Sequence, residues 1–254
     1  MAAVGISCLT ANARADEQTG KSFVERFDRL SRSFWYVADG WANGDWQACT
    51  FSDNNVAIAD GALSVELKAQ KLKDRDYSCA SVQSTQVFGY GTYEARMQSA
   101  AASGTVSAFF AYAGGPPLNQ PGDEIDFEVL GRDTNKVQLN YFVDAKPQGP
   151  QLVDVGSDSS KGMNDYAFEW APNALRWYIN GKLVREVIKS DNMPFPTHKM
   201  RIFLMIWNSM TLTDWLGPFK AQSETLAARF AWVAFTKAGE SCQFPESLLC
   251  KLKR

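Results

Sequence analysis

Three carboxylates stand at alternate positions in the segment PGDEIDFEVLG, residues 121–131: Glu124, Asp126 and Glu128. Because side chains alternate between the two faces of a strand, a strand here would carry all three acids on one face and apolar residues on the other. Like charges crowded on one face cost free energy, so the pattern needs a reason. Two carboxyl groups can hydrolyse a glycosidic bond, one as nucleophile or base and the other as an acid that keeps its proton.

The acidic pattern has two simpler explanations, a solvated strand face and a calcium site, since exposed strands alternate in this way and hard cations take oxygen ligands. Spacing favours neighbouring acids as a working pair. At about 3.4 Å per residue, the Cα atoms of Glu124 and Asp126 lie about 7 Å apart and those of Glu124 and Glu128 about 13 Å. The outer acids reach the separation of about 5–5.5 Å that retaining glycosidases use only if the strand curves, with Asp126 between them to tune their pKa values.

Other catalytic groups are scarce in the sequence. His198, in PFPTHKM, is the one histidine of the chain, and we expect it in a surface loop rather than in a catalytic triad. There is no phosphate-binding or dinucleotide-binding glycine motif, and the cysteines are better used as bridges than as zinc ligands. The carboxylates therefore remain as the chemical groups, and we expect no cofactor and no metal.

Length and composition predict one domain without charged partners. The chain has 254 residues, 45% of them hydrophobic, which is enough to bury the core of a single β domain. Its formal net charge is -2, with no long basic run, so nucleic acid and membrane are excluded as partners. Aromatic residues make up 13% of the chain, and the flat C–H faces of sugar rings pack well on such side chains.

The N-terminal segment predicts export. A weakly apolar stretch ends in Ala13-Arg14-Ala15, a pattern typical of signal-peptide cleavage, so residues 1–15 are expected to leave and residues 16–254 to form the secreted domain. Cys8 would leave with the first segment. The four remaining cysteines allow three pairings in principle. Proximity along the chain favours the bridges Cys49–Cys79 and Cys242–Cys250. Four buried free thiols are the alternative.

The remaining pattern is that of an antiparallel sandwich. Short alternating runs rich in β-branched and aromatic residues recur from NNVAIADGALSVELKAQ to ARFAWVAFTK, and helical periodicity is nearly absent. Asp60-Gly61 and Asn180-Gly181 stand between such runs, where two-residue hairpin turns are expected. The Pro/Gly-rich segment 113–122 leads directly into the acidic strand and predicts that this strand begins at the edge of a cleft.

The sequence also resembles a known family. DEIDFE is similar to the Glu-x-Asp-x-Glu signature of glycoside hydrolase family 16, in the form found in bacterial lichenases. The segments ADGWANG, FGYGTYEARM, DEIDFEVLGRDTNKVQLNY and YAFEWAPNALRWYING resemble lichenase segments in the same order, over residues 22–237. KSFVERFDRLSRSFWYVADGW and the terminal GESCQFPESLLC resemble the rhizobial members of the family that depolymerise succinoglycan.

The resemblance implies a β-jelly-roll sandwich of two antiparallel sheets, all-β, with a concave sheet that forms a polysaccharide cleft. It implies that Glu124 is the nucleophile, Asp126 the assisting carboxylate and Glu128 the general acid/base of a retaining endo-β-glycanase acting on β-1,3/β-1,4-linked glucan or succinoglycan. Cys49 and Cys79 match the lichenase disulfide, and residues 238–254 would form a disulfide-closed tail. The residues expected to line the cleft are Tyr90, Gln138, Asn140, Trp207 and Asn208.

Departures from the family pattern affect the expected substrate. Five positions that contact sugar in lichenases carry other residues here: Leu30, Ser31, Ser52, Gly122 and Met205. These departures fit a glycan of different decoration, such as an acidic or branched exopolysaccharide. Ala231 replaces a calcium-binding Asp, so no structural calcium is expected there. A lectin-like sandwich without turnover and a transglycosylase with the same residues remain alternatives, and the protein is expected to be a monomer.

Overall fold

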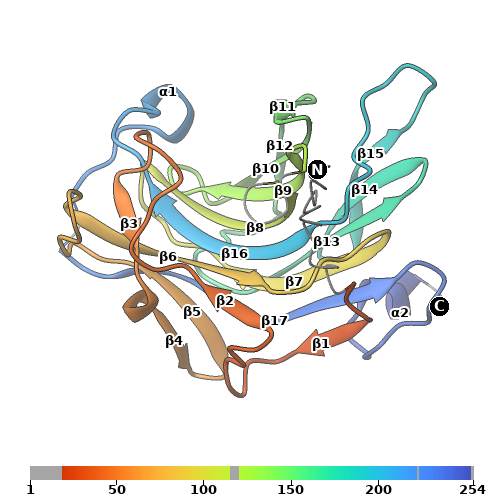
Figure 1. The fold of residues 1–254 in the computed structure, drawn as a ribbon, viewed down its shortest axis with the longest axis horizontal. Helices are drawn as coiled ribbons and strands as arrows, with labels where there is room; N and C mark the ends of the chain where they lie inside the picture. Colours follow the sequence, from red (N-terminus) through yellow and green to blue (C-terminus); the bar gives the residue numbers. More distant parts are fainter. Residues whose placement is uncertain (1–18, 115–119, 222, 253–254) are drawn as a thin grey trace, which may run out of the picture.

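The structure is a computed structural model that describes residues 19–114, 120–221 and 223–252. Two large sheets pack face to face, and neighbouring strands within them run antiparallel except for one short parallel pair, β3 with β6 (Figure 1). The expected β-jelly-roll sandwich is confirmed. Residues 1–15 and Cys8, on which the prediction of a signal peptide depends, lie outside the described residues.

The first sheet carries the acidic strand. In spatial order its strands are β11 (Lys146–Pro147), β10 (Lys136–Val143), β9 (Asp123–Leu130), β8 (Thr105–Ala113), β16 (Arg201–Asn208), β6 (Tyr77–Ser84) and β2 (Trp35–Val37), with β12 (Gln151–Asp154) beside β10 and β3 (Cys49–Phe51) beside β6. Figure 1 shows β8, β9 and β16 bowed in the same sense. This curvature is what the spacing of the acids requires.

The second sheet covers the back of the first. Its strands, in spatial order, are β15 (Lys182–Ile188), β14 (Ala174–Ile179), β13 (Asn164–Ala171), β7 (Gly91–Gln98), β17 (Leu226–Lys237), β5 (Ala62–Leu67) and β4 (Val56–Ala59), with β1 (Phe23–Glu25) beside β17. Helices are short in the described residues: η1 (Asp53–Asn55), α1 (Thr213–Leu216) and α2 (Leu248–Leu252). None of them is long and apolar enough to cross a membrane.

The core between the sheets takes the apolar face of the acidic strand. Ile125, Phe127 and Val129 are fully buried, as their alternation with the acids predicts. The ring of Phe127 packs edge-on against Tyr166 of the second sheet, with ring centroids 5.2 Å apart. Burial of this face fixes the register of β9, because a slip of one residue would turn its acids into the core.

Both predicted hairpin turns are confirmed. Asp60 and Gly61 connect β4 to β5 with φ values of 51° and 69°, and Asn180 and Gly181 connect β14 to β15 with φ values of 50° and 81°. Two successive residues with positive φ form the tight turn whose twist matches that of the strands it joins, and Asn, Asp and Gly tolerate this backbone conformation best.

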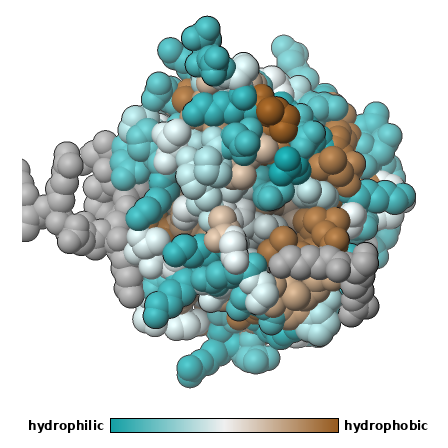
Figure 2. All heavy atoms as spheres, turned by 90° about the vertical axis from the view of Figure 1, so that its right-hand side faces the viewer, coloured by the Kyte–Doolittle hydropathy of each residue, from teal (hydrophilic) through white to brown (hydrophobic). Residues whose placement is uncertain are grey.

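Both predicted disulfides are confirmed. Cys49–Cys79 joins β3 to β6 with Cα atoms 5.7 Å apart, and Cys242–Cys250 closes a loop in the C-terminal tail with Cα atoms 5.3 Å apart. The tail is held on the second sheet by Glu94 of β7, whose buried carboxylate accepts hydrogen bonds from Ser247 Oγ and from the backbone N–H of Leu248. Figure 2 shows the side of the molecule on which the C-terminus lies, where many of the surface residues are hydrophilic.

Candidate active site

The acidic strand lies in the interior of the concave sheet, paired on both sides. Residues directly opposite one another on neighbouring strands share a face, so the acids of β9 share theirs with residues of β8 and β10. Glu124 is opposite Tyr112 of β8, and Glu128 is opposite Gln138 of β10. The first of the acids therefore has an aromatic neighbour on its face and the last an amide neighbour.

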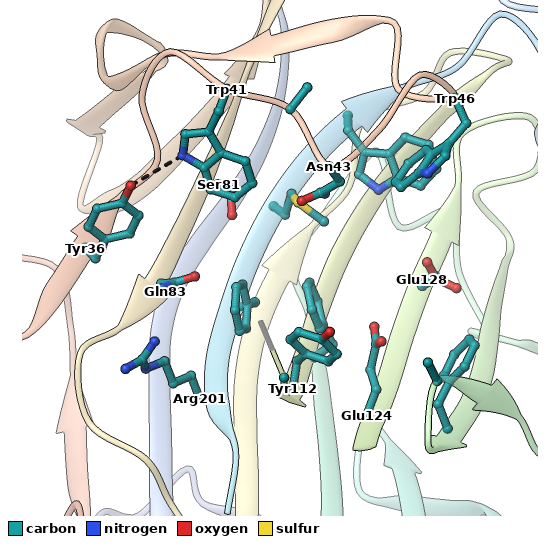
Figure 3. A pocket seen from close by; sticks show the side chains of 18 of the residues that line it. Tyr36, Trp41, Asn43, Trp46, Ser81, Gln83, Tyr112, Glu124, Glu128 and Arg201 are labelled. Atoms are coloured by element: carbon teal, nitrogen blue, oxygen red, sulfur yellow. Dashed lines mark hydrogen bonds between the residues drawn. The ribbon is translucent and has the colours of Figure 1, made fainter. Parts of the chain in front are cut away.

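A cleft of about 890 Å³ opens over this face, and Glu124 and Glu128 both line it (Figure 3). The two outer acids therefore share one cavity, as the curved-strand hypothesis requires. Asp126 lies between them in the sequence but is only 1% exposed, beneath the cleft surface. The arrangement places two reachable carboxyl groups in the cleft and one buried carboxyl beneath them.

Burial raises the pKa values of all three acids. It raises the pKa of Glu124 from its usual 4.5 to about 7 and that of Glu128 from 4.5 to about 8, where the negative charge of Glu124 adds to the effect. The pKa of Asp126 is raised because of burial and then because of the charges of both neighbours. A side-chain hydrogen bond between Asp126 and Glu124 adds to this effect: it raises the pKa of Asp126 and lowers that of Glu124, so it favours the proton on Asp126.

Contacts from outside the strand hold the acids in place. The indole Nε1 of Trp177, in the second sheet, donates to the backbone carbonyl of Asp126 across the core at 3.2 Å. At the start of β9, Asp123 Oδ2 accepts hydrogen bonds from the backbone N–H groups of Thr197 and His198 and lies 2.8 Å from His198 Nδ1. His198 thus lies in a loop, as expected, and anchors the strand end beside Glu124.

Gln138 contacts the last acid directly. Its Nε2 donates to Glu128 Oε2 at 3.1 Å, and its Oε1 accepts from Trp215 Nε1 at 2.9 Å. The prediction that Gln138 belongs to the site therefore agrees with its position. Asn140 is opposite Asp126 on β10, is almost fully buried, and faces the same side of the sheet. Asn140 thus lies beneath the cleft surface rather than on it.

Tryptophan side chains form one wall of the cleft. Trp207, a predicted substrate residue, lines the cleft and meets Trp46 edge-on with ring centroids 4.7 Å apart. Trp215 lies behind Trp207, with centroids 6.0 Å apart. Trp46 is 38% exposed, so its ring offers an open apolar surface beside the acids, of the kind on which sugar rings pack.

Two predicted substrate residues lie elsewhere. Tyr90 does not belong to the cleft lining; its ring packs edge-on against Trp170 of the second sheet, with centroids 4.7 Å apart, so it is a packing residue. Asn208 follows Trp207 on β16, and the alternation of side chains turns it to the opposite face, where it is fully buried. These two assignments, carried over from the family pattern, are corrected by the positions of the side chains.

Several cleft residues were not predicted from the sequence. They come from the loop GWANGDW and from cleft-facing positions of β2, β6, β8 and β16: Tyr36, Trp41, Asn43, Ser81, Gln83, Phe110, Tyr112, Arg201 and Phe203. The signal that identifies those on strands is period two, once the order of the strands in the sheet is known. Met205, noted as a departure from the family pattern, also lines the cleft.

No group of three or more His, Cys, Asp or Glu side chains in the described part of the chain is arranged to hold a metal ion. The alternation of the three acids of β9 spreads them along the strand, whereas cation sites converge several oxygen ligands on one point.

Comparison with known proteins agrees with this geometry. Residues 43–226 match the sequence family described as Glycosyl hydrolases family 16. The chain is 47% identical over 234 residues to the endo-1,3-1,4-beta-glycanase ExoK of Rhizobium meliloti (strain 1021), covering 92% of this chain and 86% of that protein. It is 37% identical over 233 residues to the beta-glucanase of Bacillus subtilis (strain 168), covering 91% and 93% of the two chains.

A solved structure has the same fold. The beta-glucanase of Bacillus licheniformis superposes with a TM-score of 0.80 at 36% sequence identity, covering 87% of this chain and 100% of that one. The residues of the family match include the acidic strand β9. The chain is an enzyme that belongs to glycoside hydrolase family 16.

Proposed function

We propose that the protein is a secreted, retaining endo-β-glycanase that hydrolyses β-1,3/β-1,4-linked glucan or a succinoglycan-type exopolysaccharide. One observation carries the proposal: Glu124 and Glu128 line the same cleft, where burial raises the pKa values of both and the charge of Glu124 raises that of Glu128 further. The name of the Rhizobium meliloti relative, an endo-1,3-1,4-beta-glycanase, supports the choice of linkage, and that of the Bacillus subtilis relative, a beta-glucanase, supports a β-glucan as substrate. A cleft that is lined along several strands suits attack within a chain.

Hydrolysis would proceed by two displacements. In the first, a carboxylate oxygen of Glu124 attacks the anomeric carbon while Glu128 gives its proton to the departing glycosidic oxygen, leaving a glycosyl ester on Glu124. In the second, Glu128 takes a proton from water, the water oxygen attacks the anomeric carbon, and Glu124 departs as a carboxylate. The sugar keeps its β configuration because the anomeric carbon is inverted twice.

The electrostatics of the pair suit these roles. Burial raises the pKa values of both glutamates, and the negative charge of Glu124 raises the pKa of Glu128 further, so ionisation of Glu124 favours the protonated form of Glu128. Asp126 lies between them and is held close to neutrality by burial, so it adds little repulsion to the negative charge of Glu124.

Release of reducing ends tests the catalytic roles. The wild type, Glu124→Gln and Glu128→Gln are assayed on lichenan, laminarin and succinoglycan in parallel, with Glu186→Gln as a control because Glu186 lies on β15 and pairs with Arg176. We expect both cleft variants to lose activity and the control variant to keep the activity of the wild type. Full activity of Glu124→Gln would contradict the mechanism. Resistance of all three polymers, with cleavage of another, would contradict only the substrate assignment.

Export and assembly are part of the same proposal. Residues 1–15 are proposed as a signal peptide that leaves residues 16–254 as one secreted, monomeric domain, and the two disulfides support an oxidising compartment. Mass spectrometry of the protein recovered from the culture medium would give the start of the mature chain, and light scattering its mass. Product analysis with excess acceptor sugar separates hydrolysis from transglycosylation by the same residues.

A further inference from the structure

Two aromatic side chains lie in the cleft far from the acids. Tyr36 on β2 is 42% exposed, Trp41 in the loop after β2 is 41% exposed, and both line the cleft. Exposed apolar side chains that stand singly need no explanation, whereas two neighbouring aromatic rings in a cleft indicate a binding surface. We call this pair the aromatic platform.

Register fixes how far the aromatic platform lies from the acids. Tyr36 is opposite Gln83 of β6, and Gln83 is opposite Phe203 of β16. Phe203 is opposite Phe110 of β8, and Phe110 is opposite Asp126, the middle acid of β9. The row from Asp126 to Tyr36 crosses four strand spacings of about 4.8 Å, which is about 19 Å along the sheet.

The acids lie toward the other end of the described cleft. Beyond β9, the lining residues that the structure describes are Phe142 of β10 and Ala145, whereas on the other side the lining crosses β8, β16, β6 and β2. Figure 3 shows Tyr36 and Trp41 together on the side away from the labelled glutamates. The described cleft is therefore long on one side of the acids and short on the other.

Contacts hold the aromatic platform in place. The backbone N–H of Phe51, on β3, donates to the carbonyl of Trp41 at 2.9 Å, and the two rings meet edge-on with centroids 5.0 Å apart. The indole Nε1 of Trp41 donates to the hydroxyl oxygen of Tyr36 at 3.4 Å. The disulfide Cys49–Cys79 ties β3 to β6. A surface that is fixed before the ligand arrives loses little freedom on binding.

The row between the aromatic platform and the acids can carry a glycan. Phe110 and Phe203 stack with ring centroids 4.7 Å apart, and the amide of Gln83 follows them in the row. The C–H faces of sugar rings pack on aromatic rings, and an amide forms hydrogen bonds with their hydroxyls. A unit of a β-linked glycan is about as long as one strand spacing of about 4.8 Å, so about three or four units span the row.

We propose that Tyr36 and Trp41 form a binding site for a sugar ring about three or four units from the bond that is cut, and that the enzyme thereby selects glycans by length. The inference rests on the proposed function and names its substrate as a chain long enough to reach from the acids to the aromatic platform. The ligand of the site is the flat face of a neutral sugar. The platform acts on binding and takes no part in bond breaking.

The test measures how turnover depends on chain length. The values of kcat/KM are measured on β-1,3/β-1,4-linked gluco-oligosaccharides from the trisaccharide to the octasaccharide. The ratio of the octasaccharide value to the trisaccharide value should fall about three- to tenfold in the double variant Tyr36→Ala/Trp41→Ala, as expected for loss of a sugar–aromatic contact. The decrease should begin at chains of about five units, the length that reaches the platform. A general loss of folded enzyme would lower both values and leave their ratio unchanged.

Two further variants serve as controls. Leu183→Ala removes a side chain that is 51% exposed on β15 of the second sheet, outside the cleft lining, and should keep the wild-type ratio. Tyr36→Phe/Trp41→Phe keeps both rings and should keep most of the ratio. An unchanged ratio in the double Ala variant, or an equal decrease in the double Phe variant, would overturn the inference. If the double Ala variant does not fold, Trp41→Ala alone should lower the ratio, and an unchanged ratio there would overturn it.

Binding separates this inference from the proposed function. Calorimetric titration of Glu124→Gln should show tighter binding of the octasaccharide than of the trisaccharide, by a factor that adding the two Ala substitutions reduces. Cleavage of both sugars by the wild type, with no decrease of the ratio in the double Ala variant, would refute the aromatic platform and leave the glycanase. Tighter binding of the octasaccharide that depends on Tyr36 and Trp41, without cleavage of either sugar, would refute the glycanase and leave the platform.

Discussion

Gln138 donates a hydrogen bond from Nε2 to Oε2 of Glu128 at 3.1 Å, and it is the side-chain contact that links the candidate proton donor to the cleft wall. Its other amide atom accepts from Trp215 Nε1 at 2.9 Å, so the amide cannot turn without losing a partner. A donor aimed at a carboxyl group favours the ionised form and lowers its pKa. Gln138 therefore opposes the effect of burial on Glu128.

Replacing Gln138 with Leu should raise the pKa of Glu128 above about 8, because the donated hydrogen bond is lost while burial remains. The alkaline limb of kcat/KM would move to higher pH by about half a unit to one unit, since one unit corresponds to about 1.4 kcal/mol. Trp215→Phe serves as the control, because it frees the amide of Gln138 without removing it. An alkaline limb that stays in place would show that Glu128 is not the titrating acid.

The raised pKa values also predict how stability depends on pH. The unfolded chain ionises both glutamates near 4.5, whereas the folded protein holds their protons up to about 7 and 8. The contribution of these two groups to the free energy of unfolding is therefore fully present below pH 4.5, and it is lost as the pH rises through their pKa values in the folded protein. Relative to wild type, Glu128→Gln should therefore be more stabilising at pH 9 than at pH 4, because the wild type must bury the charge of Glu128 at pH 9 and the variant has no charge there.

Urea unfolding at the two pH values measures this difference. Glu186→Gln is the control, because the carboxylate of Glu186 is exposed and paired with Arg176 on the second sheet. A stability difference between wild type and Glu128→Gln that is the same at both pH values would mean that Glu128 titrates normally in the folded protein, and the assignment of acid and nucleophile would lose its electrostatic basis.

The sequence predicted the parts of this site that depend on local pattern. Period two identified β9 and its two faces, and the positive-φ turns at Asp60-Gly61 and Asn180-Gly181 were visible as residue pairs. It could not predict that Arg201 and Tyr112 would join Glu124 in one row, because that requires the order of strands β8, β9 and β16 in the sheet. Sheet order depends on contacts between segments far apart in the chain.

The errors had a related cause. The family resemblance places Tyr90 and Asn208 in the cleft, but it carries no information on the face of the strand to which each side chain points. Asn208 follows Trp207 on β16, so alternation sends the two side chains to opposite faces. Tyr90 precedes β7, a strand of the second sheet, and its ring packs on Trp170. Period two, applied to RIFLMIWN, would have kept Trp207 and removed Asn208.

Trp46 should contribute to binding rather than to bond breaking. Its exposed ring stands against Trp207 at the cleft wall, and an indole ring has no group that gives or takes a proton in the reaction. Trp46→Ala should raise KM on a soluble β-glucan about three- to tenfold, as expected for loss of one aromatic contact, with kcat nearly unchanged. Trp46→Phe should keep most of the affinity. A fall in kcat at constant KM in the Ala variant would place Trp46 in the reacting centre instead.

The two disulfides should differ in their effect on stability. Cys49–Cys79 closes a loop with a sequence separation of 30 and Cys242–Cys250 one of 8. Constraint of the unfolded chain grows with loop length, so the double Ala variant of the first pair should lose about 3–4 kcal/mol and that of the second about 2–3 kcal/mol. Urea unfolding checks both values. A larger loss from the second pair would mean that the tail stabilises the fold by its contacts, with Glu94 foremost.

The configuration of the first product tests the central claim, that Glu124 and Glu128 act on one anomeric carbon from opposite sides in two displacements. Proton NMR of a β-1,3/β-1,4-glucan during the first minutes of cleavage distinguishes the anomers before they interconvert. Two displacements make the new reducing end appear as the β anomer, and the α anomer follows by mutarotation. An α anomer formed first would mean a single displacement by water and would contradict the account.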